Sequence, residues 1–249
     1  MAAEKTQAIV LKLVEFSETS CVVTLFTEDF GKIGALAKGA RRTKSPFEGA
    51  LDLLALVRIV FLRKSSEALD LLTEAKLQRR FRSAQRDLSR LYAGYYVAEL
   101  LSELTDKGDP HRELFQAADQ TLLALDERAP VAETVLRFEL AALRLVGHMP
   151  ALTTCVVCGK AVATDGRVPL SLAAGGVLCG ECRPGRRGVV GVSGAVITAL
   201  QRAGGELEDH EQPLTIDPTI RGELRAVMGN YFAHLVGHRL RMSEYLGRA

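Results

Sequence analysis

The chain has 249 residues, 47% of them hydrophobic, and a formal net charge of only +2. This length and composition predict a folded protein with a sizeable core. The longest apolar run, at 51–62, is interrupted by Asp52 and Arg58 and is shorter than the roughly 20 residues of a membrane helix. The start, MAAEKTQAIV, lacks the apolar core of a secretory signal. We therefore expect a cytoplasmic protein with no membrane partner, in a reducing compartment where paired cysteines more often hold metal than form disulfides.

The first eighty residues predict a small β-domain. β-branched residues and partial alternation of apolar and polar positions indicate five strands, at 7–16, 20–31, 32–39, 53–64 and 68–77. The second and third strands meet at the turn signal EDFG, and a longer connection containing Pro46 separates the third from the fourth. This arrangement is typical of a partly open Greek-key barrel of the OB type.

From about residue 80 the apolar residues recur with the 3.6-residue period of helices. Helices are expected at 81–105, 111–125, 131–146, 193–202 and 219–246. A cysteine-rich segment interrupts this pattern. The prediction is a multidomain α+β protein with an N-terminal OB-fold nucleic-acid-binding domain at 1–79, a helical bundle from 80–150 and 183–249, and an inserted four-cysteine zinc module at 151–182.

Four of the five cysteines form two C-x-x-C pairs, and the spacer between the pairs predicts a small hairpin. Such pairs let two thiolates reach one ion, and Gly159 and Gly180 stand where a tight turn would favour glycine. The expected zinc ligands are Cys155, Cys158, Cys179 and Cys182. Because four thiolates would fill a tetrahedral shell, the zinc is expected to be structural; a catalytic zinc keeps a position open for water.

Other candidate sites are weaker. His234 and His238 stand four residues apart, but Leu235 replaces the Glu of the zincin motif, so an ordinary helix pair is favoured. Cys21 lies in an apolar strand and is expected to be a buried small hydrophobe. The sequence contains no phosphate-loop, dinucleotide-binding or nucleophile-elbow motif. No nucleophile with its base is therefore indicated, and we expect no enzyme.

Clusters of cations favour a nucleic acid as the partner. OB barrels follow phosphates with Lys and Arg and stack bases on aromatic side chains, although most aromatics here are expected in the core. The segment AKGARRTKS places four cations in a loop without an acid: Lys38, Arg41, Arg42 and Lys44. A second cluster comprises Arg79, Arg80, Arg82 and Arg86. On the expected helix Arg82, Arg86 and Arg90 would form a stripe, for which a solvated face is an equal alternative. Arg183, Arg186 and Arg187 follow the last cysteine.

The segment LFTEDFGKIGALAKGARRTKS resembles the signature of the RecO family of bacterial recombination mediators, with T-x-x-x-G-K followed by A-K-G-x-R. The order of OB-type, helical and four-cysteine parts is also similar. The resemblance implies a nucleoid-associated DNA repair protein that binds single- and double-stranded DNA and anneals complementary strands. It implies work with RecR to load recombinase, and contact of the helical domain with the C-terminal tail of the single-strand DNA-binding protein. Carried over to this sequence, Lys38, Arg41, Arg42 and Lys44 become the leading DNA contacts.

Two alternatives remain open from the residues. The first is a zinc-dependent nucleic-acid enzyme, such as a nuclease or deaminase, that uses the cysteine cluster. The second is a protein adaptor whose basic faces meet acidic partners. Product formation from labelled DNA would identify the enzyme, and binding of acidic peptides without DNA affinity would identify the adaptor.

Overall fold

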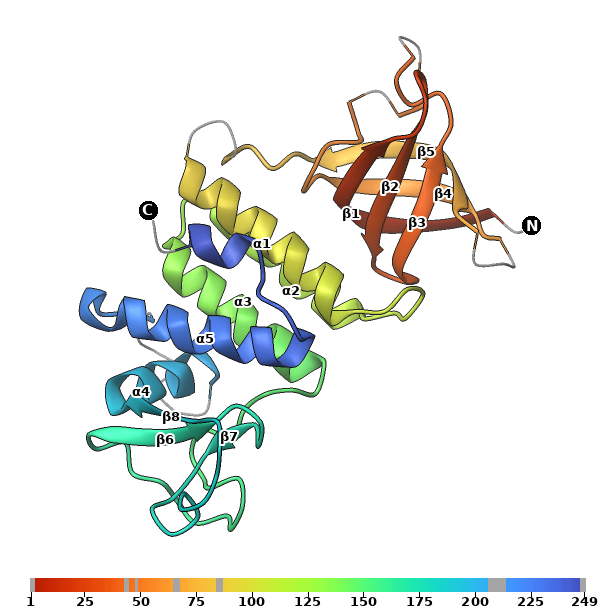
Figure 1. Cartoon of the computed structure of the whole chain (residues 1–249). Coiled ribbons are helices and arrows are strands. Elements are labelled where there is room, and N and C mark those ends of the chain that lie inside the picture. Colours follow the sequence, from red (N-terminus) through yellow and green to blue (C-terminus); the bar gives the residue numbers. More distant parts are fainter. Residues whose placement is uncertain are drawn as a thin grey trace. The chain divides into compact units, whose positions relative to one another are not determined.

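The computed structural model describes residues 3–42, 45–47, 49–64, 68–83, 87–205 and 214–246 (Figure 1). The chain divides into two compact units, Met1–Ala129 and Pro130–Ala249, which are considered separately below. Within the described residues, no helix is both long and apolar enough to cross a membrane. The three-part domain division expected from the sequence stays a prediction.

The first unit contains a closed five-stranded barrel. Its strands are β1 (Ala3–Glu15), β2 (Cys21–Thr27), β3 (Gly31–Ala37), β4 (Leu56–Leu62) and β5 (Asp70–Arg79). They pair in the order β1-β2-β3-β5-β4, and β1 also pairs with β4. Only the β3–β5 pairing is parallel. This is the OB-type arrangement, and the five strands predicted from the sequence are confirmed. The barrel is closed and not partly open as expected, because the long strand β1 pairs with both β2 and β4.

The apolar residues that alternate along the strands fill the interior of this barrel. Along β2 and β3, buried positions alternate with partly exposed ones, so that Val23, Leu25, Ile33 and Ala35 point inward. A register shift between Val10 and Lys12 marks an irregularity in β1. Such a bulge increases local bending, which suits a strand that pairs with β2 and with β4.

The described part of the first unit also contains the helices α1 (Leu88–Leu104) and α2 (Arg112–Asp126). The predicted start of α1 at residue 81 is wrong because Asp87 caps the helix: its side chain accepts a hydrogen bond from the Ser89 backbone N–H. At the other end, Lys32 Nζ donates to the Ser102 and Thr105 carbonyl oxygens. These carbonyls belong to the last turn, which has no partners within the helix. Lys32 therefore links β3 to the end of α1.

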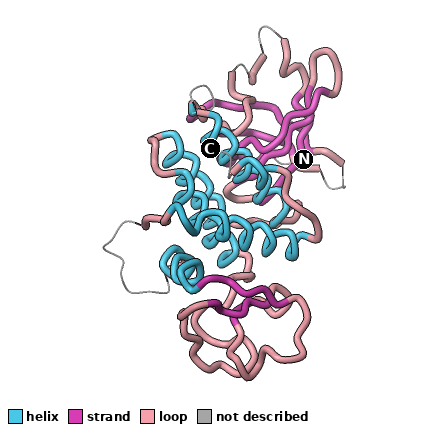
Figure 2. The backbone as a smooth tube through the Cα atoms, turned by 60° about the vertical axis from the view of Figure 1, so that its left-hand side comes forward, coloured by secondary structure: helices cyan, strands magenta, loops and turns pink. Residues whose placement is uncertain are grey.

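The second unit combines helices with a small sheet (Figure 2). Its elements are α3 (Val131–Leu145), β6 (Arg167–Ser171), β7 (Gly176–Val177), β8 (Val189–Ser193), α4 (Gly194–Ala203), η2 (Pro218–Ile220), α5 (Arg221–Val236) and η3 (Met242–Tyr245). The predicted hairpin between the cysteine pairs is confirmed as β6 and β7. The sequence interpretation missed β8, which pairs with the other edge of β6 and lies beyond the expected end of the module at residue 182.

The last predicted helix, 219–246, is too long. Residue Gly237 adopts a left-handed backbone with φ of 81°, and this conformation ends α5 at Val236. His234 therefore lies on the helix and His238 beyond it, so the expected helical pair is not formed. Both residues are exposed.

Candidate nucleic-acid interface and metal centre

The basic loop after β3 begins with a turn that is anchored to the barrel. Gly39 has a φ of 71°, a conformation that favours glycine. Its N–H donates to Ser20 Oγ at 3.3 Å, and the Arg42 N–H donates to the Gly39 carbonyl at 3.1 Å. The Arg41 N–H donates to the Thr19 carbonyl at 3.1 Å, while Ala40 packs against the barrel core. These contacts hold the backbone of 38–42 in one conformation.

The side chains of this turn point outward. Lys38, Arg41 and Arg42 are all exposed, whereas Lys44 lies outside the described residues. Arg41 Nη1 lies 3.0 Å from Glu15 Oε1, so the expectation that no acid accompanies these cations is wrong for Arg41. Sequence spacing could not reveal this pair, because β1 and the loop meet only through strand pairing. Both side chains are substantially exposed, and an exposed ion pair contributes little to the stability of the fold. Arg41 therefore stays available to another anion, such as a phosphate.

The second basic cluster is largely occupied by contacts within the first unit. Arg79 forms an ion pair with Asp119, and Arg80 donates to the Gly49 carbonyl at 3.0 Å. Arg82 is exposed, and its backbone N–H is held by the Asp126 carboxylate. Arg86 lies outside the described residues. The role of these four residues in DNA binding stays a prediction.

The prediction that Arg82, Arg86 and Arg90 form a stripe along one helix is wrong. Arg82 precedes α1, which begins at Leu88. Arg90 turns back toward the protein, where it pairs with Asp87 at 3.1 Å and donates to the Leu125 and Ala129 carbonyls at 2.8 and 2.9 Å. Its side chain is therefore mostly buried in structural contacts.

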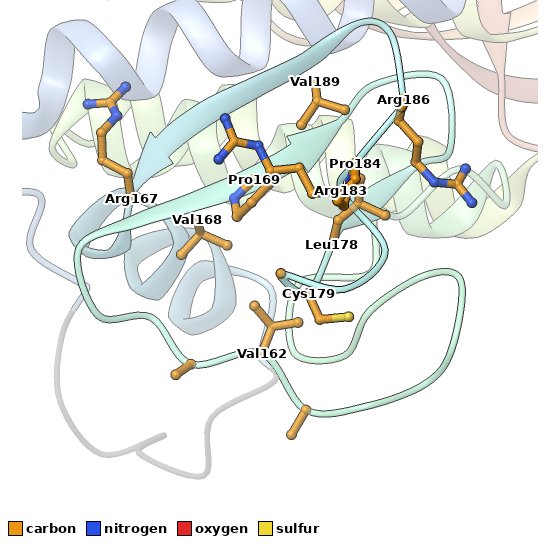
Figure 3. Close-up of a pocket in the computed structure, with 14 residues that line it drawn as sticks. Val162, Arg167, Val168, Pro169, Leu178, Cys179, Arg183, Pro184, Arg186 and Val189 are labelled. Carbon is orange, nitrogen blue, oxygen red and sulfur yellow. The ribbon is translucent and has the colours of Figure 1, made fainter.

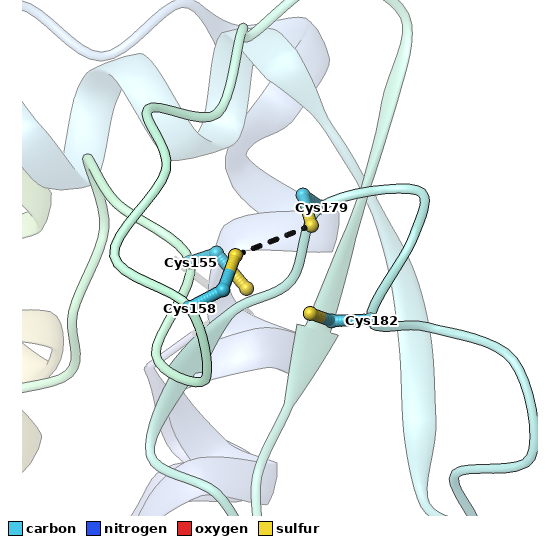
Figure 4. A group of neighbouring side chains, drawn as sticks. All are labelled: Cys155, Cys158, Cys179 and Cys182. Atoms are coloured by element: carbon cyan, nitrogen blue, oxygen red, sulfur yellow. Dashed lines mark hydrogen bonds between the residues drawn. The ribbon is translucent and has the colours of Figure 1, made fainter.

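The four cysteines of the second unit come together as the spacing predicts (Figure 4). Cys155 and Cys158 lie before β6, and Cys179 and Cys182 follow β7. All four sulfur atoms lie within 4.8 Å of one another, and the Cys158 and Cys179 sulfurs are 3.7 Å apart. A zinc ion with four Zn–S bonds of about 2.3 Å needs sulfurs about 3.8 Å apart. The group therefore fits a tetrahedral metal ion.

Backbone hydrogen bonds shape each cysteine pair. Cys155 donates its N–H to the Lys160 carbonyl at 2.7 Å, and the Gly159 N–H donates back to Cys155 at 2.8 Å. Gly159 has a φ of 72°, as the expected need for glycine implies. Gly180 does not adopt a left-handed backbone, so the expectation that the turn at this position favours glycine is wrong. Lys160 and Glu181 join the two pairs through a 2.6 Å ion pair.

The electrostatics of the cluster favour a bound cation. The backbone N–H of Cys179, with those of Val157 and Cys158, lowers the pKa of the Cys155 thiol to about 6. Hydrogen bonds with Cys179 and Cys158 raise the pKa of Cys182 to about 12. Four thiolates so close together repel one another unless a metal ion neutralises them. With four sulfur ligands the shell is complete, which is the donor set of a structural metal site.

An open pocket of about 900 Å³ lies beside the cysteines (Figure 3). Its lining is partly apolar, including Val168 and Pro169, and three arginines border it. Arg167 is held by the Gly191 carbonyl and lies 3.3 Å from Glu223, and Arg186 Nε donates to the Cys182 carbonyl at 3.0 Å. Two of these three cations therefore already serve the fold.

The remaining cysteine belongs to the barrel core. Cys21 is 8% exposed, and burial raises the pKa of its thiol. This confirms the expectation of a buried hydrophobe. In the described part of the chain, the four clustered cysteines form the one group of His, Cys, Asp or Glu side chains close enough to hold a metal.

Comparison with known proteins places this architecture in a family. The model for the Recombination protein O N terminal matches residues 1–81, and the model for the Recombination protein O C terminal matches residues 85–244. The chain belongs to the RecO family. It is 44% identical to the DNA repair protein RecO of Rhodopirellula baltica, over 96% of this chain and 97% of that one. It is 34% identical to DNA repair protein RecO of Anaeromyxobacter dehalogenans strain 2CP-1 and 33% identical to that of Myxococcus xanthus, with at least 96% of each chain covered.

Membership of the RecO family confirms the resemblance read from the N-terminal signature. The protein is a DNA repair and recombination protein of a family of non-enzymatic mediators. The alternative of a zinc-dependent nuclease or deaminase is thereby set aside.

Proposed function

We propose that this RecO protein binds single- and double-stranded DNA through the basic loop after β3 and anneals complementary strands. The observation that carries the proposal is the anchored turn 38–42, which presents exposed cations from the end of an OB-type barrel. Its DNA contacts would be Lys38, Arg41, Arg42 and Lys44. Arg79, Arg80, Arg82 and Arg86 are secondary candidates, because the described members of that cluster also make contacts inside the protein.

Annealing requires no bond to be made or broken. Two DNA strands repel each other through their phosphates, and cations that bind both backbones reduce that repulsion while releasing counterions. Because phosphate contacts carry no sequence information, binding should be similar for unrelated sequences. A protein that only brings strands together needs this charge and a rigid support for it.

Family membership supports a wider role in the cell. We propose that the protein acts with RecR to load recombinase onto single strands, and that its helical region binds the C-terminal tail of the single-strand DNA-binding protein. This work would place it in the cytoplasm, at the nucleoid. The domain assignment 1–79, 80–150 with 183–249, and 151–182 belongs to the same proposal.

Zn²⁺ is the metal we propose for the four cysteines. It suits a complete set of thiolate ligands, and Cys155, Cys158, Cys179 and Cys182 would hold it. Its part is structural: it would tie the loop before β6 to the loop after β7.

The test of the DNA interface is the double variant Arg41→Glu with Arg42→Glu. Affinity for several unrelated single strands and duplexes should fall alike, and the slope of log affinity against log salt should decrease by about two if both residues meet phosphates. Fluorescence anisotropy at several salt concentrations measures both quantities.

A matched control keeps the change in net charge constant. Arg137 on α3 and Arg221 on α5 are exposed, and reversing both alters the charge equally in the second unit. This control should bind DNA nearly as the unchanged protein does. If the Arg41 and Arg42 variant also binds normally, the loop is not the DNA interface.

A further inference from the structure

Phe16 is an aromatic side chain placed in solvent. It follows the last residue of β1 and is 64% exposed, and Val14 on the same strand is 46% exposed. A single exposed apolar residue needs no explanation by itself. The position of Phe16 in the fold is what makes it informative.

The turn 16–20 that holds Phe16 lies beside the basic turn 38–42. Glu15 pairs with Cys21, and Cys21 pairs with Ala37, so both turns leave the same end of the barrel. The Phe16 N–H donates to the Ser20 carbonyl at 3.0 Å, and Ser20 Oγ accepts from the Gly39 N–H. Hydrogen bonds thus connect the backbone of Phe16 to the backbone of the basic turn.

A second connection passes through the neighbouring side chains. Glu15, directly before Phe16, forms the ion pair with Arg41, and Thr19 accepts the Arg41 backbone N–H. The backbone segments that carry the aromatic ring and the guanidinium are therefore held next to each other at this end of the barrel. In OB folds the loop between the first two strands is a usual place for oligonucleotide contacts.

The other aromatic side chains of the barrel region cannot offer a face to a ligand in this way. Phe26, Phe47 and Phe61 are at most 2% exposed. Phe30 packs edge-on against Phe61 with ring centroids 5.4 Å apart, and the Arg63 guanidinium lies 5.9 Å from its ring centroid. The expectation that most of these rings are in the core is confirmed, and Phe16 is the exception.

We infer that Phe16 is a stacking platform for an unpaired base of a single strand whose phosphates lie along Lys38, Arg41 and Arg42. This inference rests on the proposed DNA-binding function and extends it. Single-strand binding typically combines cations that follow the backbone with aromatic faces that stack bases. Stacking covers the face of a base and leaves its pairing edge free, which is compatible with annealing. In a duplex the base faces are already stacked, so Phe16 contributes there far less.

The substitution Phe16→Trp provides a direct readout, because the chain contains no tryptophan. Titration with an oligothymidine single strand should quench the fluorescence of the introduced indole, and a blunt duplex of equal length should leave it nearly unchanged. The control is Val190→Trp, at a residue 37% exposed on β8 of the second unit and away from the residues proposed to contact DNA, which should not be quenched by either DNA. A Phe16→Trp protein that binds single strands by anisotropy without quenching overturns the inference.

Affinity measurements give an independent test. Phe16→Ala should weaken binding to the single strand by about tenfold, the order expected for one stacked base, while Phe16→Tyr should retain affinity. Duplex affinity should change by less than about twofold in both variants. An equal loss for the two kinds of DNA would show that the substitution disturbs the hairpin, and would reject stacking; unchanged melting temperatures establish that the variants fold.

The failure of this inference differs from failure of the proposed function. If reversal of Arg41 and Arg42 abolishes DNA binding while the Phe16 variants behave like the unchanged protein, only stacking is excluded. If the unchanged protein binds neither single strands nor duplexes, the DNA-binding function itself fails, and the stacking inference fails with it.

Discussion

At the scale of single residues, the second unit depends on buried charge that is closely matched. Glu139 on α3 has no exposed side-chain surface, and its two carboxylate oxygens accept from the two Arg225 guanidinium nitrogens of α5, at 3.0 and 2.5 Å. Glu133, also on α3, accepts the Ile216 backbone N–H at 3.0 Å. Buried carboxylates are costly without such partners, so these contacts specify how α5 and its preceding segment pack on α3.

Removal of one partner should therefore be severe. Arg225→Met takes the guanidinium away from the buried Glu139 carboxylate, and we expect a loss of about 3–5 kcal/mol in the free energy of unfolding. Denaturation with urea measures this loss. Arg137→Met, on the exposed face of α3, is the control and should change stability by less than about 0.5 kcal/mol.

The double variant Glu139→Leu with Arg225→Met separates charge from packing. It removes the buried carboxylate together with the guanidinium and should be more stable than Arg225→Met alone. If Arg225→Met unfolds like the unchanged protein, the pair is not important for stability.

At the scale of elements, the turn between β2 and β3 ties the barrel to α2. The Asp29 carboxylate accepts from Thr6 Oγ1 of β1 at 2.8 Å and forms an ion pair with Arg112, the first residue of α2. The Thr6 hydroxyl and the Arg112 guanidinium lower the pKa of Asp29 below its ordinary value. One carboxylate thus contacts two elements besides its own turn.

This carboxylate predicts a pH dependence. Because the folded pKa is below the unfolded value of about 3.9, its stabilisation is present above that value and is lost as pH falls through the folded pKa. Asp29→Asn should lower the melting temperature at pH 7, and the difference from the unchanged protein should shrink below about pH 4. Melting curves between pH 7 and pH 3 test this.

The exposed Asp165 provides a control for the loss of a carboxylate elsewhere. Asp165→Asn should differ little from the unchanged protein across the same range. A constant difference between Asp29→Asn and the unchanged protein at all pH values would mean that ionisation of Asp29 is not the cause.

At the scale of the whole molecule, the two units depend on different means of stabilisation. The barrel surrounds a continuous apolar core and closes its own sheet edges. The cysteine loops of the second unit flank a small three-stranded sheet in which β7 has only two residues. A sheet this short has little stability by itself, so we expect a bound metal ion to be needed to keep these loops ordered.

Metal removal should therefore act on one unit more than on the other. We expect a strong chelator, or Cys158→Ser, to lower the melting temperature of the second unit and to expose the chain around Arg183 and Arg186 to trypsin. The barrel should remain resistant, and added Zn²⁺ should restore the unchanged protein but not the variant. Cys21→Ser is unsuitable as a control because Cys21 is buried; Val157→Ser, between the ligands, keeps all four thiols. Equal melting and digestion with and without metal would reject a structural zinc.

The sequence by itself determined the features that depend on local pattern. Alternation in 20–39 indicates β2 and β3, because strand faces repeat every two residues. The C-x-x-C spacing brings Cys155 toward Cys158 and Cys179 toward Cys182, because a short turn can place both sulfurs on one ion. Glycine is the residue that most often ends a helix, so Gly237 was a local signal for the end of α5. The predicted helix 219–246 overlooked this signal.

Only the tertiary structure decided which residues meet across the chain. Asp87 caps α1, so the helix begins at Leu88, Arg82 precedes it, and the expected arginine stripe is not formed. The pairing of β2 with both β1 and β3 brings Glu15 beside Arg41 and the turn that carries Phe16 beside the basic turn. Periodicity can show that a residue is apolar or charged, but exposure and ion pairing depend on neighbours that are distant in sequence. The candidate base-stacking face of Phe16 therefore became visible only once the barrel had closed.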